Sequence, residues 1–163
     1  MNINLKDLDA LVFDFDGVLT DNRVFLNEDG NEFVSCHRGD GLAFNVLNTI
    51  GIKTFIISSE KNKVVSARAK KLEIQVIQGV ENKVNTLIAL EKKENISAKN
   101  ILYIGNDLND FDVMKLCGYT ACPSDSHYMI IANSDIVLET KGGMGVAREL
   151  VEQVLEIDMM LYL

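Results

Sequence analysis

The chain has 163 residues, of which 47% are hydrophobic, and a formal net charge of −8. This length is enough to bury one substantial core and is short for two ordinary domains, so we expect residues 1–163 to form a single domain. The negative charge repels polyanions and no Lys/Arg cluster offsets it, which argues against nucleic acid as a partner.

The N-terminal segment MNINLKDLDALVF carries acidic side chains where a signal peptide needs an apolar centre. No apolar run approaches the ~18 residues that a membrane span requires. We therefore expect a cytoplasmic protein without a membrane partner. Its cysteines, Cys36, Cys117 and Cys122, lack paired spacing, so small buried apolar side chains are expected rather than a disulfide framework or a zinc site.

Short apolar runs alternate with segments of helical period along most of the chain. This pattern predicts a mainly parallel sheet flanked by helices. The expected strands are Ala10–Asp14, Lys53–Ile57, Gln75–Ile77, Ile101–Ile104, Tyr119–Cys122 and Ile136–Leu138.

Two segments show the three-and-four spacing of amphipathic helices. In Glu81–Lys93 the apolar side chains on one face are Val84, Leu87 and Ile88. Near the end of the chain the repeating apolar residues are Val146, Leu150, Val151, Val154 and Leu155. Both faces are expected to pack into the core.

Arg23–Cys36 departs from the alternation of strands and helices. Its two short apolar runs flank Glu28, Asp29, Gly30 and Asn31, which is a turn signal typical of a β-hairpin. The complete pattern predicts an α/β fold, a Rossmann-like three-layer α/β/α sandwich, with this hairpin after the first strand.

Polar residues follow the expected strands at the ends where ligands bind in such sheets. They are Asp14, Asp16, Ser58, Asn106 and Asp107, and Lys83 adds a cation near the start of the helix after the third strand. A cation such as Mg²⁺ would offset the cost of placing two carboxylates two residues apart in DFDGVLT.

These residue types fit phosphoryl transfer. A carboxylate at Asp14 can attack phosphorus, and Asp16 can act as an acid toward the leaving alcohol and then as a base toward water. Ser58 and Lys83 can neutralise the phosphate oxygens. Mg²⁺ would be held by Asp14, the carbonyl oxygen of Asp16, and a ligand from Asn106 or Asp107.

The segments DFDGVLT and GNDLND, together with Ser58 and Lys83, resemble the four motifs of the haloacid dehalogenase superfamily. Further stretches resemble its capless branch: DGNEFVSCHRGDGLAF, IISSEKNKVVSARAKKL, QGVENKVNTL and KGGMGVARELV. That branch contains 3-deoxyoctulosonate 8-phosphate phosphatase, 2-keto-3-deoxynononate 9-phosphate phosphatase and the phosphatase-like domain of some acylneuraminate cytidylyltransferases.

The resemblance implies an Mg²⁺-dependent phosphatase with Asp14, Asp16, Ser58 and Lys83 as its catalytic residues. It implies sugar-acid binding by Glu60, Arg68 and Lys71. It also implies a homotetramer in which the hairpins associate and a neighbour's C-terminal tail helps to close the site. The metabolic context would be lipopolysaccharide or sialic acid synthesis, with a cytidylyltransferase of the same pathway as a possible partner.

Asn106 departs from the family pattern, because members with GDDLND place a metal-binding acid at this position. An amide oxygen is still a hard ligand, so a working site with weaker metal affinity is expected. The alternative is a weakly active or inactive oligomerisation or partner-binding module related to the cytidylyltransferase domain.

Several residues also have an ordinary structural interpretation. Ser58 or Ser59 could cap a helix beginning near Lys61, and Lys83 could be a surface lysine. His37, Arg38 and His127 are more often structural than catalytic. The glycine-rich segment Gly142–Gly145 either binds an anion through its N–H groups or only forms a turn.

Overall fold

The computed structural model describes residues 3–163 and contains one six-stranded sheet whose neighbouring strands all run parallel. Its spatial order is β5-β4-β1-β6-β7-β8. The strands are β1 (Ala10–Phe13), β4 (Lys53–Ile57), β5 (Gln75–Ile77), β6 (Ile101–Ile104), β7 (Tyr119–Cys122) and β8 (Ile136–Val137). The six predicted strands are therefore confirmed, with β1 and β8 each ending one residue earlier than expected.

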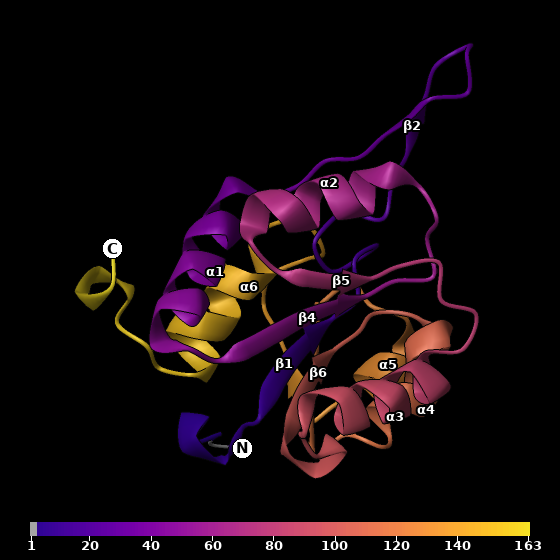
Figure 1. The fold of residues 1–163 in the computed structure, drawn as a ribbon. Coiled ribbons are helices and arrows are strands. Elements are labelled where there is room, and N and C mark those ends of the chain that lie inside the picture. The colour runs from indigo at the N-terminus through magenta and orange to yellow at the C-terminus, as the bar shows by residue number, and fades with distance from the viewer. Residues whose placement is uncertain (1–2) are drawn as a thin grey trace.

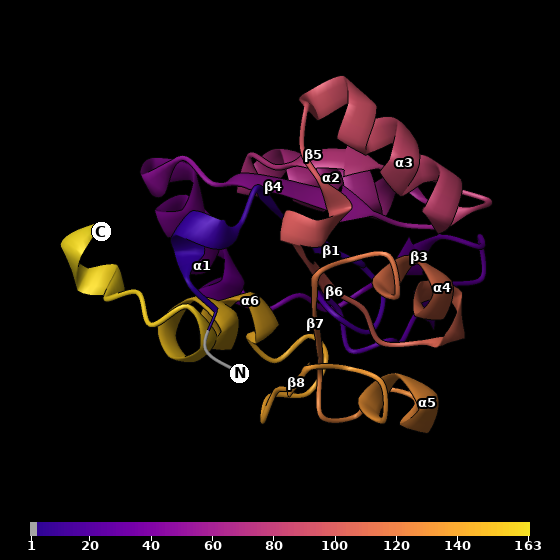
Figure 2. The same cartoon turned by 90° about the horizontal axis from the view of Figure 1, so that it is seen from below.

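Helices cover both faces of this sheet (Figures 1 and 2). The helices are α1 (Arg38–Ile50), α2 (Lys63–Leu72), α3 (Lys83–Glu94), α4 (Phe111–Met114), α5 (Tyr128–Ile131) and α6 (Val146–Glu149). Short 3₁₀ turns are η1 (Leu5–Asp7), η2 (Ala98–Asn100), η3 (Leu108–Asp110) and η5 (Met159–Leu161), and η4 (Leu150–Val154) is a π-helical segment.

Alternating side chains of the central strand enter two separate hydrophobic cores. Leu11 and Phe13 of β1 lie in the core beneath α1, α2 and α6, whereas Ala10 and Val12 lie in the core beneath α3, α4 and α5. Because β1 is buried on both faces, its run of four apolar residues needs no polar alternation. The predicted three-layer α/β/α arrangement is confirmed.

Two helix predictions need correction. The helix expected over Glu81–Lys93 begins at Lys83, because Asn82 has extended backbone and its side chain accepts a hydrogen bond from the Asn85 N–H. The amphipathic C-terminal segment is α-helical only over Val146–Glu149 and then widens into the π-helical segment η4.

The predicted hairpin is present and projects away from the sheet (Figure 1). Its strands are β2 (Phe25–Leu26) and β3 (Glu32–Phe33), and Phe25 lies opposite Phe33. The hairpin is the only insertion between β1 and α1 within residues 3–163, so no cap domain is present in the described chain.

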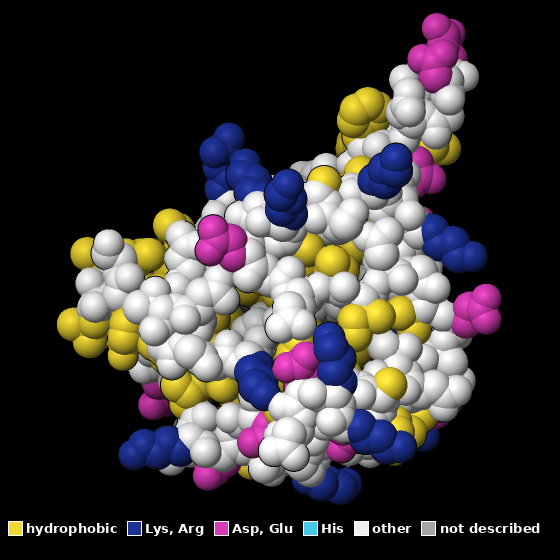
Figure 3. All heavy atoms as spheres, viewed as in Figure 1, with side chains coloured by type: hydrophobic (Ala, Val, Ile, Leu, Met, Phe, Trp, Pro, Cys, Tyr) yellow, Lys and Arg dark blue, Asp and Glu magenta, His cyan; other side chains and the backbone are white. Residues whose placement is uncertain are grey.

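Exposed apolar side chains gather on the hairpin and at the C-terminal end (Figure 3). On the hairpin they are Val24, Phe25, Leu26 and Phe33, and at the C-terminal end they are Met160, Leu161, Tyr162 and Leu163. Among the described helices, none has the length and apolar character to cross a membrane.

Candidate active site

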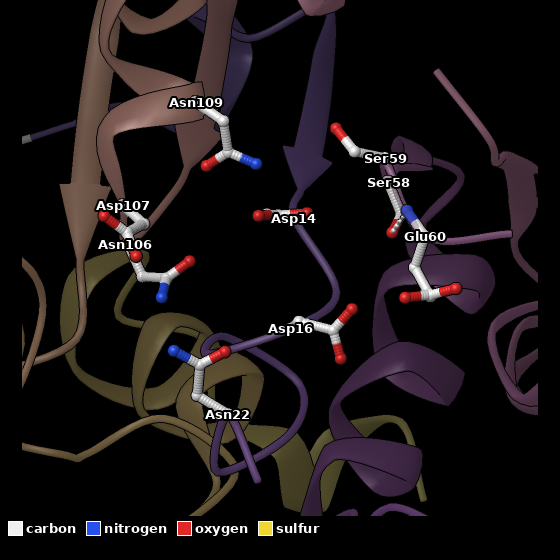
Figure 4. A pocket seen from close by; sticks show the side chains of 9 residues that line it. All are labelled: Asp14, Asp16, Asn22, Ser58, Ser59, Glu60, Asn106, Asp107 and Asn109. Carbon is white, nitrogen blue, oxygen red and sulfur yellow. Dashed lines mark hydrogen bonds between the residues drawn. The ribbon is translucent and has the colours of Figure 1, made fainter. Parts of the chain in front are cut away.

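The site lies where the strand order changes direction, at the carboxyl end of β1 between β4 and β6. A cavity of about 400 Å³ opens there. Its lining residues are Asp14, Asp16, Asn22, Ser58, Ser59, Glu60, Asn106, Asp107 and Asn109. Figure 4 shows Asp14 near the centre, with Ser58 and Glu60 on one side and Asn106 and Asp107 on the other.

Asp14 is buried and fixed by two donors. Its Oδ1 accepts a hydrogen bond from the Phe15 N–H at 2.7 Å, and its Oδ2 lies 2.9 Å from the Lys83 ammonium. Burial and the charge of Asp110 raise the pKa of Asp14 from 3.8 to about 8, although Lys83 acts in the opposite direction. A further cation near Asp14 would therefore stabilise its carboxylate form.

Lys83 is not the surface residue that a lone lysine usually is. It is 5% exposed and lies between Asp14 and Asp110, with its ammonium 2.7 Å from Oδ1 of Asp110. Burial by itself would lower the pKa of Lys83, but the two carboxylates raise it. Lys83 therefore carries a fixed positive charge beside Asp14.

Asp16 lies two residues further along the loop, at the cavity wall. Thr20 Oγ1 donates a 3.4 Å hydrogen bond to Oδ1 of Asp16. Burial and the nearby charge of Glu60 raise the pKa of Asp16. A raised pKa favours the protonated form from which a general acid starts.

Ser58 is buried at the end of β4, and its Oγ accepts a hydrogen bond from the Glu60 N–H. The helix-cap interpretation of Ser58 and Ser59 is wrong, because the side chain of Asn62 caps α2. Glu60 also lines the cavity, and its Oε1 accepts hydrogen bonds from the N–H groups of Lys61 and Asn62.

The loop after β6 brings Asn106 to the cavity and leaves its Oδ1 buried without a hydrogen-bond partner. An orphaned buried carbonyl oxygen is costly unless a cation or donor satisfies it. Its neighbour Asp107 is exposed, and its Oδ1 accepts from the Leu108 N–H at the start of η3. Asp14, Asp16 and the Asn106 oxygen thus form an oxygen set that fits Mg²⁺.

Gly17 allows this close approach of the two loops. Its φ is +80°, and a Cβ atom there would lie 1.9 Å from Nδ2 of Asn106. Any side chain at this position would therefore displace the Asn106 amide.

Arg68 and Lys71, which were predicted to bind the substrate, do not line this cavity. Arg68 donates from Nη2 to the His37 carbonyl oxygen, and Lys71 is exposed. Both histidines have a structural contact, because His37 caps α1 and His127 caps α5 through their ring Nδ1 atoms.

At the start of α6, which follows the glycine-rich turn, two N–H groups are already bonded within the chain. The N–H groups of Ala147 and Arg148 both donate to Oδ1 of Asp40, a buried carboxylate from α1. The carboxylate of Asp40 therefore provides, from within the same chain, the negative charge that the start of α6 attracts.

Sequence reasoning missed one residue that is buried behind the cavity lining and one that lines the cavity. Asp110, the last acid of GNDLND, is fully buried and binds Lys83. Asn22 lines the cavity with a left-handed backbone, φ +61°. Position within a quoted motif could have identified Asp110, whereas Asn22 carried no comparable signal.

The predicted cysteine state agrees with the structure, in which Cys117 and Cys122 are buried free thiols and Cys36 is a half-buried one. None of them lines the cavity. Neither a disulfide nor a thiolate ligand therefore contributes to the site.

A family model of haloacid dehalogenase-like hydrolases matches residues 44–150. The chain is 32% identical over 151 residues to 3-deoxy-D-manno-octulosonate 8-phosphate phosphatase of Salmonella typhi, covering 92% of this chain and 80% of the relative. The corresponding phosphatase of Escherichia coli K12 shows the same identity and coverage.

Solved structures show the same likeness. A putative hydrolase of this family from Streptomyces avermitilis superimposes with a TM-score of 0.93 at 38% identity, covering 98% of both chains. The octulosonate phosphatase from Moraxella catarrhalis, solved with a magnesium ion, a phosphate ion and a KDO molecule, gives a TM-score of 0.88 at 32% identity. This match covers 93% of this chain and 87% of that one.

Proposed function

The chain belongs to the haloacid dehalogenase-like hydrolases, in the subfamily of 3-deoxy-D-manno-octulosonate 8-phosphate phosphatases, and on this premise we propose which ester it cleaves and how. It is a phosphoric monoester hydrolase acting on a sugar phosphate. The substrate that we propose is an ulosonate phosphate, either an octulosonate 8-phosphate or a nononate 9-phosphate.

The observation that carries this proposal is the meeting of Asp14, Lys83 and Asp16 at one end of β1. Asp14 attacks phosphorus and forms an aspartyl-phosphate, while Asp16 gives its proton to the leaving sugar oxygen. Asp16 then takes a proton from the water that attacks the aspartyl-phosphate, and inorganic phosphate is released. Ser58 holds a phosphate oxygen through both steps, and Lys83, buried behind Asp14, supplies a fixed positive charge that neutralises the nucleophile and the phosphate.

The cofactor that we propose is Mg²⁺. It would be held by Asp14, the Asp16 carbonyl oxygen and Asn106, together with Asp107 from the same loop as Asn106. Support comes from the orphaned Oδ1 of Asn106 and from the magnesium ion in the Moraxella relative. When bound, the ion neutralises phosphate charge and orients the ester.

The cavity's own charge bears on how a sugar acid would be held. Its ionisable lining residues are Asp14, Asp16, Glu60 and Asp107, so no lysine, arginine or histidine of residues 3–163 lines it. A substrate with a carboxylate as well as a phosphate therefore needs a cation from outside the cavity of one chain.

We place that cation on a neighbouring copy in a homotetramer assembled through the exposed apolar hairpins. Arg68 and Lys71 lie on α2, whose cap residue Asn62 donates to Glu32 of the hairpin at 3.0 Å. Hairpin contact would thus bring a neighbour's α2 close to the cavity mouth, and Glu60 would contact the sugar hydroxyls. The exposed C-terminal residues would cover part of the opening.

The test is phosphate release, with and without Mg²⁺, from octulosonate 8-phosphate, deoxynononate 9-phosphate and acylneuraminate 9-phosphate. We expect one substrate to be strongly preferred and Asp14→Asn to lower kcat by at least about a thousandfold. Asp112→Asn removes an exposed carboxylate of α4, and should retain full activity.

Release no greater than the Asp14→Asn blank on all three esters, even at high Mg²⁺, would contradict the proposed substrate class. Asn106 is the feature that would then favour the alternative, a weakly active or inactive oligomerisation or partner-binding module. A cytidylyltransferase of the same pathway is the partner that we propose in either case.

A further inference from the structure

Tyr103 carries the only polar side chain of strand β6, whose other residues are Ile101, Leu102 and Ile104. It is fully buried in the core beneath α3, α4 and α5. A buried hydroxyl is costly unless it is hydrogen-bonded, and phenylalanine would fill this space without that cost. The hydroxyl of Tyr103 donates instead to Oδ1 of Asp110 at 3.0 Å.

Asp110 receives donors on both of its oxygens. Oδ1 accepts from the Lys83 ammonium at 2.7 Å as well as from Tyr103, and Oδ2 accepts from the Asn106 N–H at 3.0 Å. Gly105 leaves room for this carboxylate, because a Cβ atom at Gly105 would lie 2.6 Å from Cβ of Asp110. One side chain thus links β6, the start of α3 and the loop that carries Asn106.

The ammonium of Lys83 is shared between Asp110 at 2.7 Å and Asp14 at 2.9 Å. Because Lys83 is only 5% exposed, its two ion pairs are weakly screened by solvent. The balance between the attraction of Asp110 and that of Asp14 therefore sets the position of the ammonium. Tyr103 donates to the same oxygen that binds Lys83. A second donor on that oxygen reduces its attraction for the ammonium and fixes the plane of the Asp110 carboxylate.

On the premise of the phosphatase mechanism proposed above, we propose that Tyr103 is a positioning residue for the reaction. Through Asp110, its hydroxyl keeps the Lys83 ammonium at Asp14, where it neutralises the nucleophile and the phosphate oxygens. Tyr103 itself is fully buried and does not line the cavity, so its role is indirect. Without the hydroxyl, Asp110 binds Lys83 more tightly and draws it away from Asp14.

The variant that tests this is Tyr103→Phe, which keeps the ring and removes only the hydroxyl. With p-nitrophenyl phosphate and saturating Mg²⁺, kcat should fall roughly tenfold to a hundredfold. KM should change by less than about twofold, because the charge of Lys83 still attracts phosphate. The matched control is Tyr119→Phe, whose half-buried ring packs on the opposite core, and it should retain the parental kcat.

A double-mutant cycle shows whether Tyr103 acts through Asp110. Asp110→Asn should lower kcat more than Tyr103→Phe does, and the double variant should be no slower than Asp110→Asn alone. Independent losses that multiply would overturn the inference. An unchanged kcat in Tyr103→Phe with only a lowered melting temperature would also overturn it, since that result marks a structural role.

A crystal structure of Tyr103→Phe gives a readout that does not depend on turnover. We expect the Lys83 ammonium to lie beyond about 3.5 Å from Oδ2 of Asp14, compared with 2.9 Å in the parent. An unchanged separation contradicts the role of Tyr103 even if the protein hydrolyses every ester tested. A lengthened separation in a protein without turnover supports the role of Tyr103 and refutes the proposed reaction instead.

Discussion

Asn106 places a neutral amide beside Asp14 and Asp16, with its Oδ1 buried and without a partner. Asn106→Asp puts a full negative charge at the same position. We expect Mg²⁺ to bind roughly tenfold more tightly, because affinity for hard cations rises with ligand charge. Isothermal titration calorimetry with MgCl₂ on the substrate-free protein measures this directly.

The matched control for Asn106→Asp is Asn109→Asp, which adds the same charge at an exposed position of the same cavity. We expect Asn109→Asp to change Mg²⁺ affinity by much less. In metal-free buffer only Asn106→Asp should lower the melting temperature, because only that carboxylate would be buried. Equal affinities in Asn106→Asp and the parent would show that Asn106 is not a ligand.

Asn22 offers a test that separates backbone conformation from side-chain contact. Asparagine and glycine both tolerate its left-handed φ of +61°, but only asparagine places an amide at the cavity mouth, as Figure 4 shows. We expect Asn22→Gly to fold normally and to lower kcat/KM for the sugar acid phosphate about tenfold, the cost of one lost polar contact.

p-Nitrophenyl phosphate, which lacks a sugar, is the control substrate for Asn22→Gly, and its hydrolysis should be unaffected. Asn22→Ala should in addition lower the melting temperature, because alanine is strained at this φ. If Asn22→Gly keeps the parental kcat/KM on both esters, Asn22 is required only for its left-handed backbone conformation and not for a side-chain contact with the substrate.

The residues in the quoted motifs could be placed from the sequence because each follows a strand of a parallel sheet. Asp14, Asp16, Ser58 and Asn106 accordingly lie around one cavity, and Lys83 contacts Asp14. The link from Tyr103 through Asp110 could not be foreseen. It depends on how a strand side chain and a 3₁₀ turn meet across a buried core, and local spacing does not encode such a contact.

At the scale of elements, Asp40 joins α1 to α6. Its Oδ1 accepts from the N–H groups of Ala147 and Arg148, and its Oδ2 is buried without a partner. Burial raises the pKa of Asp40 above 3.8, although the two N–H groups and the charges of His37 and Arg68 act against this. The folded protein therefore holds this proton to a higher pH than the unfolded chain does.

The sign of the pH effect follows from that difference. The contribution of Asp40 to stability is fully present below the unfolded pKa and is lost as the pH rises through the folded pKa. Asp40→Asn removes this titration. As the pH rises above the ordinary pKa of 3.8, the melting temperature of Asp40→Asn should thus fall less steeply than that of the parent.

Differential scanning fluorimetry across this pH range provides the measurement. Asp112→Asn makes the same change of net charge at an exposed residue, so it accounts for general charge repulsion. Parallel curves for Asp40→Asn and Asp112→Asn would contradict the role assigned to Asp40.

Most elements followed from the sequence because their period and their caps are local. The ranges of β4, β5, β6 and β7 agree with the predicted ones. The C-terminal helix was the exception: its apolar spacing is helical, but the widening of the helix at Leu150–Val154 reflects packing that periodicity does not reveal.

At the scale of the whole molecule, the hairpin presents Val24, Phe25, Leu26 and Phe33 to solvent. Patches of this kind mark association surfaces. We expect Phe25→Glu to convert the proposed tetramer into smaller species, as measured by multi-angle light scattering. Ile88→Glu adds the same charge on α3, where Ile88 is 39% exposed, and should leave the molar mass unchanged.

A monomeric parent protein would contradict the proposed assembly outright. A Phe25→Glu variant that keeps the parental mass would instead locate the interface elsewhere. Phe25→Glu could dissociate and lose hydrolysis of the sugar acid phosphate while it still cleaves p-nitrophenyl phosphate. That result would show that the assembly supplies the contact to the substrate's carboxylate.

The position of β1 at the centre of the sheet has a consequence for synthesis on the ribosome. β1 emerges first, but its hydrogen-bonding partners are β4 and β6, which begin at Lys53 and Ile101. Until Ile104 has left the exit tunnel, the strand that ends beside Asp14 lacks a neighbour along one edge. Asp14 is thus made well before Asn106 and Asp110, which complete its surroundings.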